Sequence, residues 1–427
     1  MSEGSTRSRT VEKSVDLTFL SFLLLAYVCT AMFRMSIGVM LPEIAKEFKL
    51  VEAQSGAFFS SLFLGTAMTM AIAGHASDRL GRGITSTAGL SLISVGLLLA
   101  GYSNSYLMSL CSFFIAGLGL GIFVPSLYAF MGEVLPRSRG FLVGVTNSFY
   151  ALGAFLGPWF SGNIANYYGW RIPFYIFGLV GIPIALGIWF LKPRPFSKAK
   201  RYQGERLPRA SYLQMLKTRN VLVISIGLFV ANLGFGSFAA WTPTFLSSVD
   251  GLDITQTGLA FGIWALAGGV GAIVLGWLSD RLGRRVTILA SGIFAAVLGY
   301  LYFITVNSFL TVVGLSAILG FTSFAYWSLF ISLAQDSVRP AAIGSVTGLI
   351  QNLSMIAEII MPLMTATLIM TVGIVWAMIT SVCIPYFVQG ILVLASKERS
   401  TLCQADSREN LPLVNSLSRF RFEKLKS

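Results

Sequence analysis

Two ionisable residues, Arg34 and Glu358, lie inside long apolar stretches of the 427-residue sequence. A charge within a membrane-length segment is costly unless a partner or a watery cavity solvates it. A guanidinium can hold one carboxylate through two parallel hydrogen bonds, and a buried carboxylate that loses its counter-charge takes up a proton. The two residues therefore predict an anion-binding arginine and a proton-coupling glutamate. A purely structural salt bridge between two parts of the protein is the alternative.

Rigid elements that cross a membrane must position these side chains. Hydrophobic residues make up 55% of the chain and charged residues 11%, with a mean hydropathy of +0.75, whereas a soluble domain carries about 25% charged residues. Because about 20 apolar residues span a bilayer, we expect an all-α membrane protein. Its twelve transmembrane helices are expected near 17–41, 55–76, 84–102, 106–132, 141–163, 172–191, 220–246, 256–278, 286–304, 309–333, 344–369 and 374–395.

An internal repeat divides these helices into two halves. The stretch 74–83, GHASDRLGRG, returns 202 residues later as GWLSDRLGRR over 276–285, and each copy lies between two apolar runs. Pro42 and Pro243 occupy equivalent places and are expected to end the first helix of each half. The repeat predicts parallel halves with a site at their interface.

The domain organisation follows from this repeat. We expect an N-terminal six-helix bundle over 1–191, a cytoplasmic basic linker over 192–219 and a C-terminal six-helix bundle over 220–395. The polar, basic tail over 396–427 is expected to be cytoplasmic and disordered.

The positive charge of the chain indicates membrane topology. Placing both termini and alternate loops in the cytoplasm puts 27 of the 31 Lys and Arg residues on that side, three outside and one, Arg34, within a helix. This distribution is what the positive-inside rule requires. We therefore expect a multi-pass monomer in the plasma or inner membrane, surrounded by the lipid bilayer, with no nucleic-acid partner.

The sequence lacks the residue patterns of an enzyme. Its four cysteines have no C-x-x-C spacing, it has a single histidine, and it contains no catalytic triad or phosphate-binding loop. We expect no catalytic activity, no metal site and no cofactor.

The repeated pattern resembles the signature of major facilitator superfamily transporters, G-x-x-x-D-R-x-G-R-R, which lies between helices 2 and 3 and is echoed between helices 8 and 9. The first copy departs from it at Gly83. The resemblance implies two six-helix bundles and a conformational latch, in which Asp78 meets the start of the eleventh helix and holds the outward-facing state. The residues of this latch are Asp78, Arg79, Arg82, Asp280, Arg281 and Arg284.

The segment from Arg34 to Pro42 is similar to the end of helix 1 in the organophosphate antiporters and anion:cation symporters of that superfamily. There the arginine binds the anionic group of the substrate. Tyr27 resembles the phenol that those antiporters place beside it, and Tyr150 takes the place of their central histidine. Phe235 stands where they carry a second arginine, so one guanidinium is expected to bind one carboxylate.

Asn147 and Gln351 occupy repeat-related helices and are expected to line the cavity, with plain interhelical hydrogen bonds as the alternative. Together these residues predict a secondary transporter that carries a small organic anion, a monocarboxylate, coupled to H⁺ or Na⁺. The alternative function is a proton-coupled exporter of drugs or cations, in which Glu358 is the counter-charge of the substrate.

Overall fold

The structure, a computed structural model, describes the backbone of residues 3–134, 139–191, 218–305, 308–338 and 343–396. The expected linker and tail lie, apart from residues 218, 219 and 396, outside this part of the chain. The first half contains α1 (Glu3–Phe48), α2 (Glu52–Leu80), α3 (Arg82–Tyr102), α4 (Tyr106–Val134), α5 (Arg139–Tyr168) and α6 (Arg171–Leu191).

The second half is built in the same way. It contains α8 (Arg219–Ser248), α9 (Ile254–Leu282), α10 (Arg284–Ile304), α11 (Phe309–Ser323), α12 (Tyr326–Asp336) and α13 (Ile343–Val372). Its last span is assembled from α14 (Ile374–Met378), the π-helix η3 (Ile379–Cys383), α15 (Ile384–Leu392) and the 3₁₀ turn η4 (Val393–Ala395).

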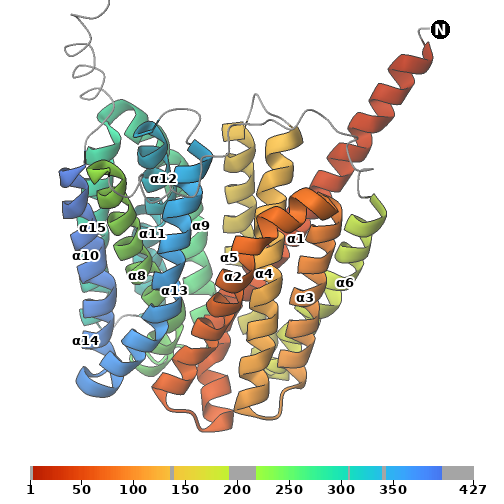
Figure 1. The fold of residues 1–427 in the computed structure, drawn as a ribbon. Helices are drawn as coiled ribbons and strands as arrows, with labels where there is room; N and C mark the ends of the chain where they lie inside the picture. The colour runs from red at the N-terminus through yellow and green to blue at the C-terminus, as the bar shows by residue number, and fades with distance from the viewer. Residues whose placement is uncertain (1–2, 135–138, 192–217, 306–307, 339–342, 397–427) are drawn as a thin grey trace, which may run out of the picture.

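These helices form two six-helix bundles side by side (Figure 1). Within the described residues, ten helical stretches are long and apolar enough to cross a membrane. The other two spans, α2 and α5, pack along α4 and α9 respectively. The all-α, twelve-span architecture expected from the sequence is confirmed.

The sequence repeat is also a repeat of packing. A Cβ on Gly117 of α4 would lie 2.0 Å from the carbonyl oxygen of Leu62 on α2, and one on Gly320 of α11 would lie 2.0 Å from that of Trp264 on α9. Both positions need glycine, because only a residue without a side chain lets two helix backbones approach so closely. The two halves thus share the same tight helix pair at equivalent positions.

The repeated signature folds into helix ends joined by one glycine. Gly81 and Gly283 have φ values of +94° and +93°, a region that favours glycine. The preceding Asp and Arg residues belong to the ends of α2 and α9, and the next helix begins at the following arginine. The connection is therefore shorter than the segments 77–83 and 279–285 that the expected helices leave between them.

Pro42 and Pro243 do not end their helices, and the sequence-based expectation is wrong here. Both lie inside, since α1 continues to Phe48 and α8 to Ser248. Proline removes one helical hydrogen bond, but surrounding helices in a membrane protein hold such a segment together. Here α1 and α8 pack against each other: a Cβ added to Gly38 of α1 would lie 3.3 Å from the Pro243 ring of α8.

The expected helix 309–333 is interrupted between Ser323 and Tyr326.

Candidate functional site

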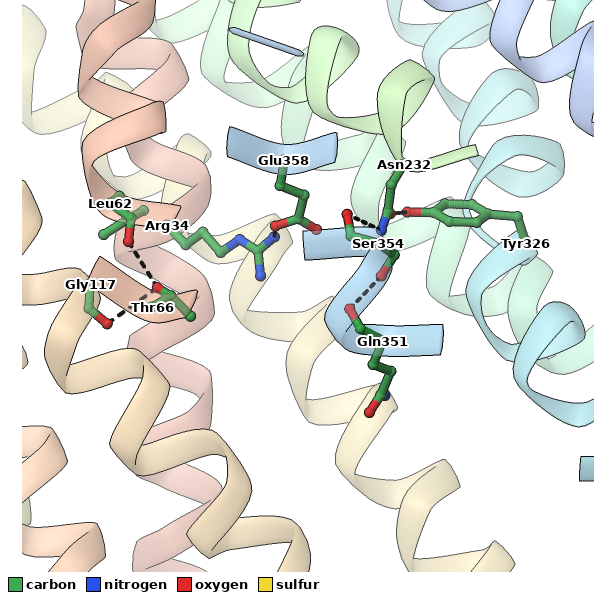
Figure 2. A network of polar contacts seen from close by, with 9 residues as sticks. All are labelled: Arg34, Leu62, Thr66, Gly117, Asn232, Tyr326, Gln351, Ser354 and Glu358. Carbon is green, nitrogen blue, oxygen red and sulfur yellow. Dashed lines mark hydrogen bonds and ion pairs between the residues drawn. The ribbon is translucent and has the colours of Figure 1, made fainter. Parts of the chain in front are cut away.

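Arg34 and Glu358 form an ion pair that joins the two halves of the molecule. The Arg34 Nη2 of α1 donates to the Glu358 Oε2 of α13 at 2.8 Å, as Figure 2 shows. The side chains are only 20% and 4% exposed, respectively. The sequence analysis singled out both residues, and the fold brings them into direct contact across 324 residues.

The pair lies in a small pocket between the halves. Its lining combines these two charges with three phenylalanines and small or apolar residues: Arg34, Met35, Phe59, Phe63, Phe235, Gly236, Ala239 and Glu358. The guanidinium also lies over the Phe63 ring, 4.8 Å from its centroid, where a cation is attracted to the π-system. About 10 Å³ of free volume remains, which is room for no more than about one water molecule.

The hydrogen bonding of Arg34 is incomplete. In the described part of the chain, the bond to Glu358 is the one hydrogen bond between the guanidinium and another protein group. A guanidinium has several further N–H donors in a planar fork, and Arg34 is among the residues that line the pocket. The arrangement can therefore accept a second anionic group, or exchange Glu358 for one.

Contacts between the halves extend from this pocket to one end of the molecule. Ser60 of α2 donates to the Ile359 carbonyl of α13 at 2.6 Å. A Cβ on Gly56 would lie 2.7 Å from the Pro362 oxygen, and one on Gly258 of α9 would lie 2.3 Å from the Pro158 oxygen of α5. We call this the closed end, where the turns at 49–51 and 249–253 lie. Toward the other end the ribbons of the halves diverge (Figure 1).

A fold of two packed helix bundles is shared with known transporters. Residues 23–362 match the Major Facilitator Superfamily. The chain belongs to this superfamily. It is accordingly a multi-pass membrane transporter and not an enzyme, as the signature turns imply.

Several proteins are similar over most of the chain. The hexuronate transporter of Bacillus subtilis (strain 168) is 28% identical over 82% of this chain and 87% of its own length. The gallate transporter of Pseudomonas putida is 25% identical over 66% of this chain and 69% of its own. Among solved structures, a bacterial homolog of the human lysosomal transporter Spinster has a TM-score of 0.73 at 18% identity, and the match covers 90% of this chain and 95% of that one. At this level of identity, the structural similarity shows a shared fold.

The predicted tyrosines, Tyr27 and Tyr150, interact electrostatically with Arg34 but are not among the residues that line the pocket. The rings of Tyr27 and Tyr150 are 5.5 Å apart, and the hydroxyls of Tyr27 and Tyr128 are 3.4 Å apart. Tyr128 donates to the Asn147 Oδ1, also at 3.4 Å. These long hydrogen bonds are weak, so the polar ends of Tyr27 and Asn147 remain adaptable.

Gln351, by contrast, is not brought to the charge pair. It lies two turns before Glu358 on α13, and its side chain extends away from Arg34 (Figure 2). Its backbone carbonyl accepts a hydrogen bond from the Ser354 hydroxyl. Its place in the substrate site remains a prediction.

A buried polar network on the other side of Glu358 escaped the sequence analysis. The Tyr326 hydroxyl donates to the Asn232 Oδ1 at 2.5 Å, and the Asn232 Nδ2 donates to the Ser354 carbonyl at 3.4 Å. Asn232 is fully buried. The Tyr326 hydroxyl thus fixes the Asn232 amide, which bonds to α13 one turn before Glu358. The one signal in the sequence that could have revealed this network was a polar residue, Asn232, within an apolar run.

The latch residues of the second half form a compact charge cluster. Arg284 donates from Nε to the Asp336 Oδ2 at 2.5 Å and lies 3.3 Å from the Asp280 Oδ1. Arg281 instead lies over the Trp277 ring, 3.9 Å from its centroid. These contacts tie the ends of α9, α10 and α12 together.

In the first half the Asp78 side chain lies outside the described residues. Arg82 donates to the Ser77 hydroxyl at 2.8 Å, and Arg79 is exposed. The role of these residues as a latch stays a prediction.

The described residues contain no group of three or more His, Cys, Asp and Glu side chains that could hold a metal ion. Cys29, Cys111 and Cys383 are free thiols.

Proposed function

We propose that this protein is a secondary active transporter of a small organic anion, a monocarboxylate, which it carries across the plasma or inner membrane by alternating access with proton coupling. One observation carries the proposal: Arg34 lines the pocket between the halves and makes a single hydrogen bond there, to Glu358. The similar hexuronate and gallate transporters carry, by their names, substrates that share a carboxylate.

A single guanidinium favours a single carboxylate. Phosphate recognition in proteins commonly uses several cationic groups, but the pocket lining contains one cation, and Phe235 faces it from the second half. A carboxylate matches the planar fork of one arginine bidentately. Charge and geometry thus support a monoanion.

Glu358 supplies the proposed coupling. In the ion pair its carboxylate occupies the position that a substrate carboxylate would take on Arg34. When the substrate binds, Glu358 loses its counter-charge while its side chain stays almost fully buried, and burial without a partner favours the protonated form. Anion and proton then travel together. When the substrate leaves, Arg34 stabilises the ionised glutamate again and the proton departs.

The packing of the halves supports alternating access. The contacts at Gly56, Ser60 and Gly258 lie on one side of the pocket only. The charge distribution of the loops predicts that this closed end faces the outside. The present conformation is then inward-facing, and transport requires these contacts to separate as the halves rock.

Counterflow of a labelled carboxylate in proteoliposomes tests the proposal. Arg34→Ala should abolish carboxylate counterflow, because the substrate loses its counter-charge. Glu358→Gln serves as the matched control, since it removes the other charge of the pair but keeps the anion site.

The alternative function, a proton-coupled exporter of cationic drugs, predicts the reverse outcome. In that case Glu358 binds the substrate, so Arg34→Ala should leave cation efflux intact while Glu358→Gln abolishes it. Carboxylate counterflow that persists in Arg34→Ala would overturn the anion assignment.

A further inference from the structure

The pocket around Arg34 is predominantly aromatic. Phe59 and Phe63 line it from α2 and Phe235 lines it from α8, so the walls on both halves carry rings. Among the lining residues, Arg34 and Glu358 supply the charged side chains. We propose that the transported anion is an aromatic monocarboxylate, held with its carboxylate on Arg34 and its ring between the phenylalanines of the two halves. This inference rests on the proposed function.

The aromatic wall continues behind the pocket. The Phe235 ring lies 5.4 Å from Trp264, 5.5 Å from Phe324 in an edge-to-face arrangement, and 5.8 Å from Tyr326. These separations are those at which ring pairs attract each other beyond their apolar area. The neighbours hold Phe235 in place, so a ligand ring would meet a fixed aromatic surface and order little of the protein on binding.

A glycine without a packing constraint lies beside this wall. Gly236 follows Phe235 on α8, and a Cβ added there would find nothing closer than the Met361 Cβ at 3.8 Å. Helix packing therefore does not demand glycine at this position, unlike at Gly117 or Gly320. The missing side chain leaves the α8 backbone open to the pocket. Because only about 10 Å³ is free in this conformation, the ring enters this place when the two halves move apart.

The same walls disfavour a sugar acid. Each hydroxyl of a polyol needs a hydrogen-bond partner when it leaves water, and a buried hydroxyl without one weakens binding. Phe59, Phe63, Met35 and Ala239 offer no side-chain partner. A saturated ring of similar size lacks both flatness and a π-system, so it should bind less tightly than an aromatic ring.

Binding of three carboxylates to the purified full-length protein tests the inference. Benzoate should bind at least about fivefold more tightly than cyclohexanecarboxylate, because ring pairs add to area burial, and glucuronate should bind more weakly still. Phe235→Leu keeps an apolar wall but should remove most of the preference of benzoate over cyclohexanecarboxylate. Phe113→Leu is the matched control: it removes an equally buried ring of α4 that contacts Phe58 and Phe174 away from the pocket, and the preference should be unchanged.

A second variant tests the space beside the ring. Gly236→Val puts a branched side chain on the α8 wall and should weaken benzoate binding about tenfold or more, while acetate binding changes less than threefold, since a clash of the ring with new methyl groups costs far more than contact with a small anion.

The outcomes separate the two proposals. Tighter binding of glucuronate than of benzoate, abolished by Arg34→Ala, would overturn the aromatic assignment and leave the organic-anion function intact. An equal preference for benzoate over cyclohexanecarboxylate in wild type and in Phe235→Leu would also overturn the aromatic assignment. If none of the carboxylates binds in a manner that depends on Arg34, both proposals fail.

Discussion

Replacing Glu358 by glutamine should tighten anion binding, because the glutamate competes with the substrate for Arg34. The competing contact is one charge-assisted hydrogen bond of 2.8 Å between side chains that are 20% and 4% exposed. A hydrogen bond to a charged group contributes about 1.5–3 kcal/mol, and about 1.4 kcal/mol changes an affinity tenfold. The Glu358→Gln protein should therefore bind the carboxylate roughly ten- to a hundredfold more tightly.

The same substitution should uncouple transport from protons, since glutamine cannot release or take up a proton. Exchange of labelled for unlabelled substrate should persist in proteoliposomes, whereas accumulation driven by an imposed pH gradient should be lost. Glu47→Gln is the control, because Glu47 pairs with Arg171 through bonds of 2.6 and 2.7 Å at the closed end, away from the pocket. An unchanged affinity of Glu358→Gln for the carboxylate would refute the competition for Arg34. Accumulation of substrate by Glu358→Gln under a pH gradient alone would show that Glu358 is not the proton site.

Three further substitutions test the packing around the site. Gly258→Ala places a Cβ 2.3 Å from a backbone carbonyl oxygen of α5. It should therefore hold the two halves apart at the closed end and raise the labelling of cysteines introduced there. Gly314→Ala is the control, because a Cβ at Gly314 meets nothing within 4 Å, and it should leave this labelling unchanged. Tyr326→Phe leaves the buried Asn232 carbonyl without its donor and should destabilise the protein by about 1–3 kcal/mol, visible as a lower melting temperature. Asp78→Asn should weaken the proposed outward-facing latch; unchanged labelling of residues near the signature turns would contradict this role.

Composition, the length of the apolar segments and the internal repeat were sufficient to predict the fold. The membrane has no water for backbone groups, so long apolar segments must form complete helices, and the repeated turn at Gly81 and Gly283 divides them into two halves. The same reasoning found Arg34 and Glu358, because a charge inside an apolar run has few explanations other than a partner or a site. These conclusions need no knowledge of how the helices pack.

Only the tertiary structure decided which residues meet. The sequence placed Arg34 and Glu358 inside apolar runs, but their contact depends on how the two halves dock, and no local pattern encodes that. Tyr326, which bonds to the buried Asn232, follows a helix interruption that hydropathy does not reveal. Gln351 shared the helix of Glu358 and was expected at the same cavity, yet two turns of rise carry its side chain away from the pair. Hydrophobicity sets which segments are helical, whereas the contacts between distant segments depend on the shapes of their packed surfaces.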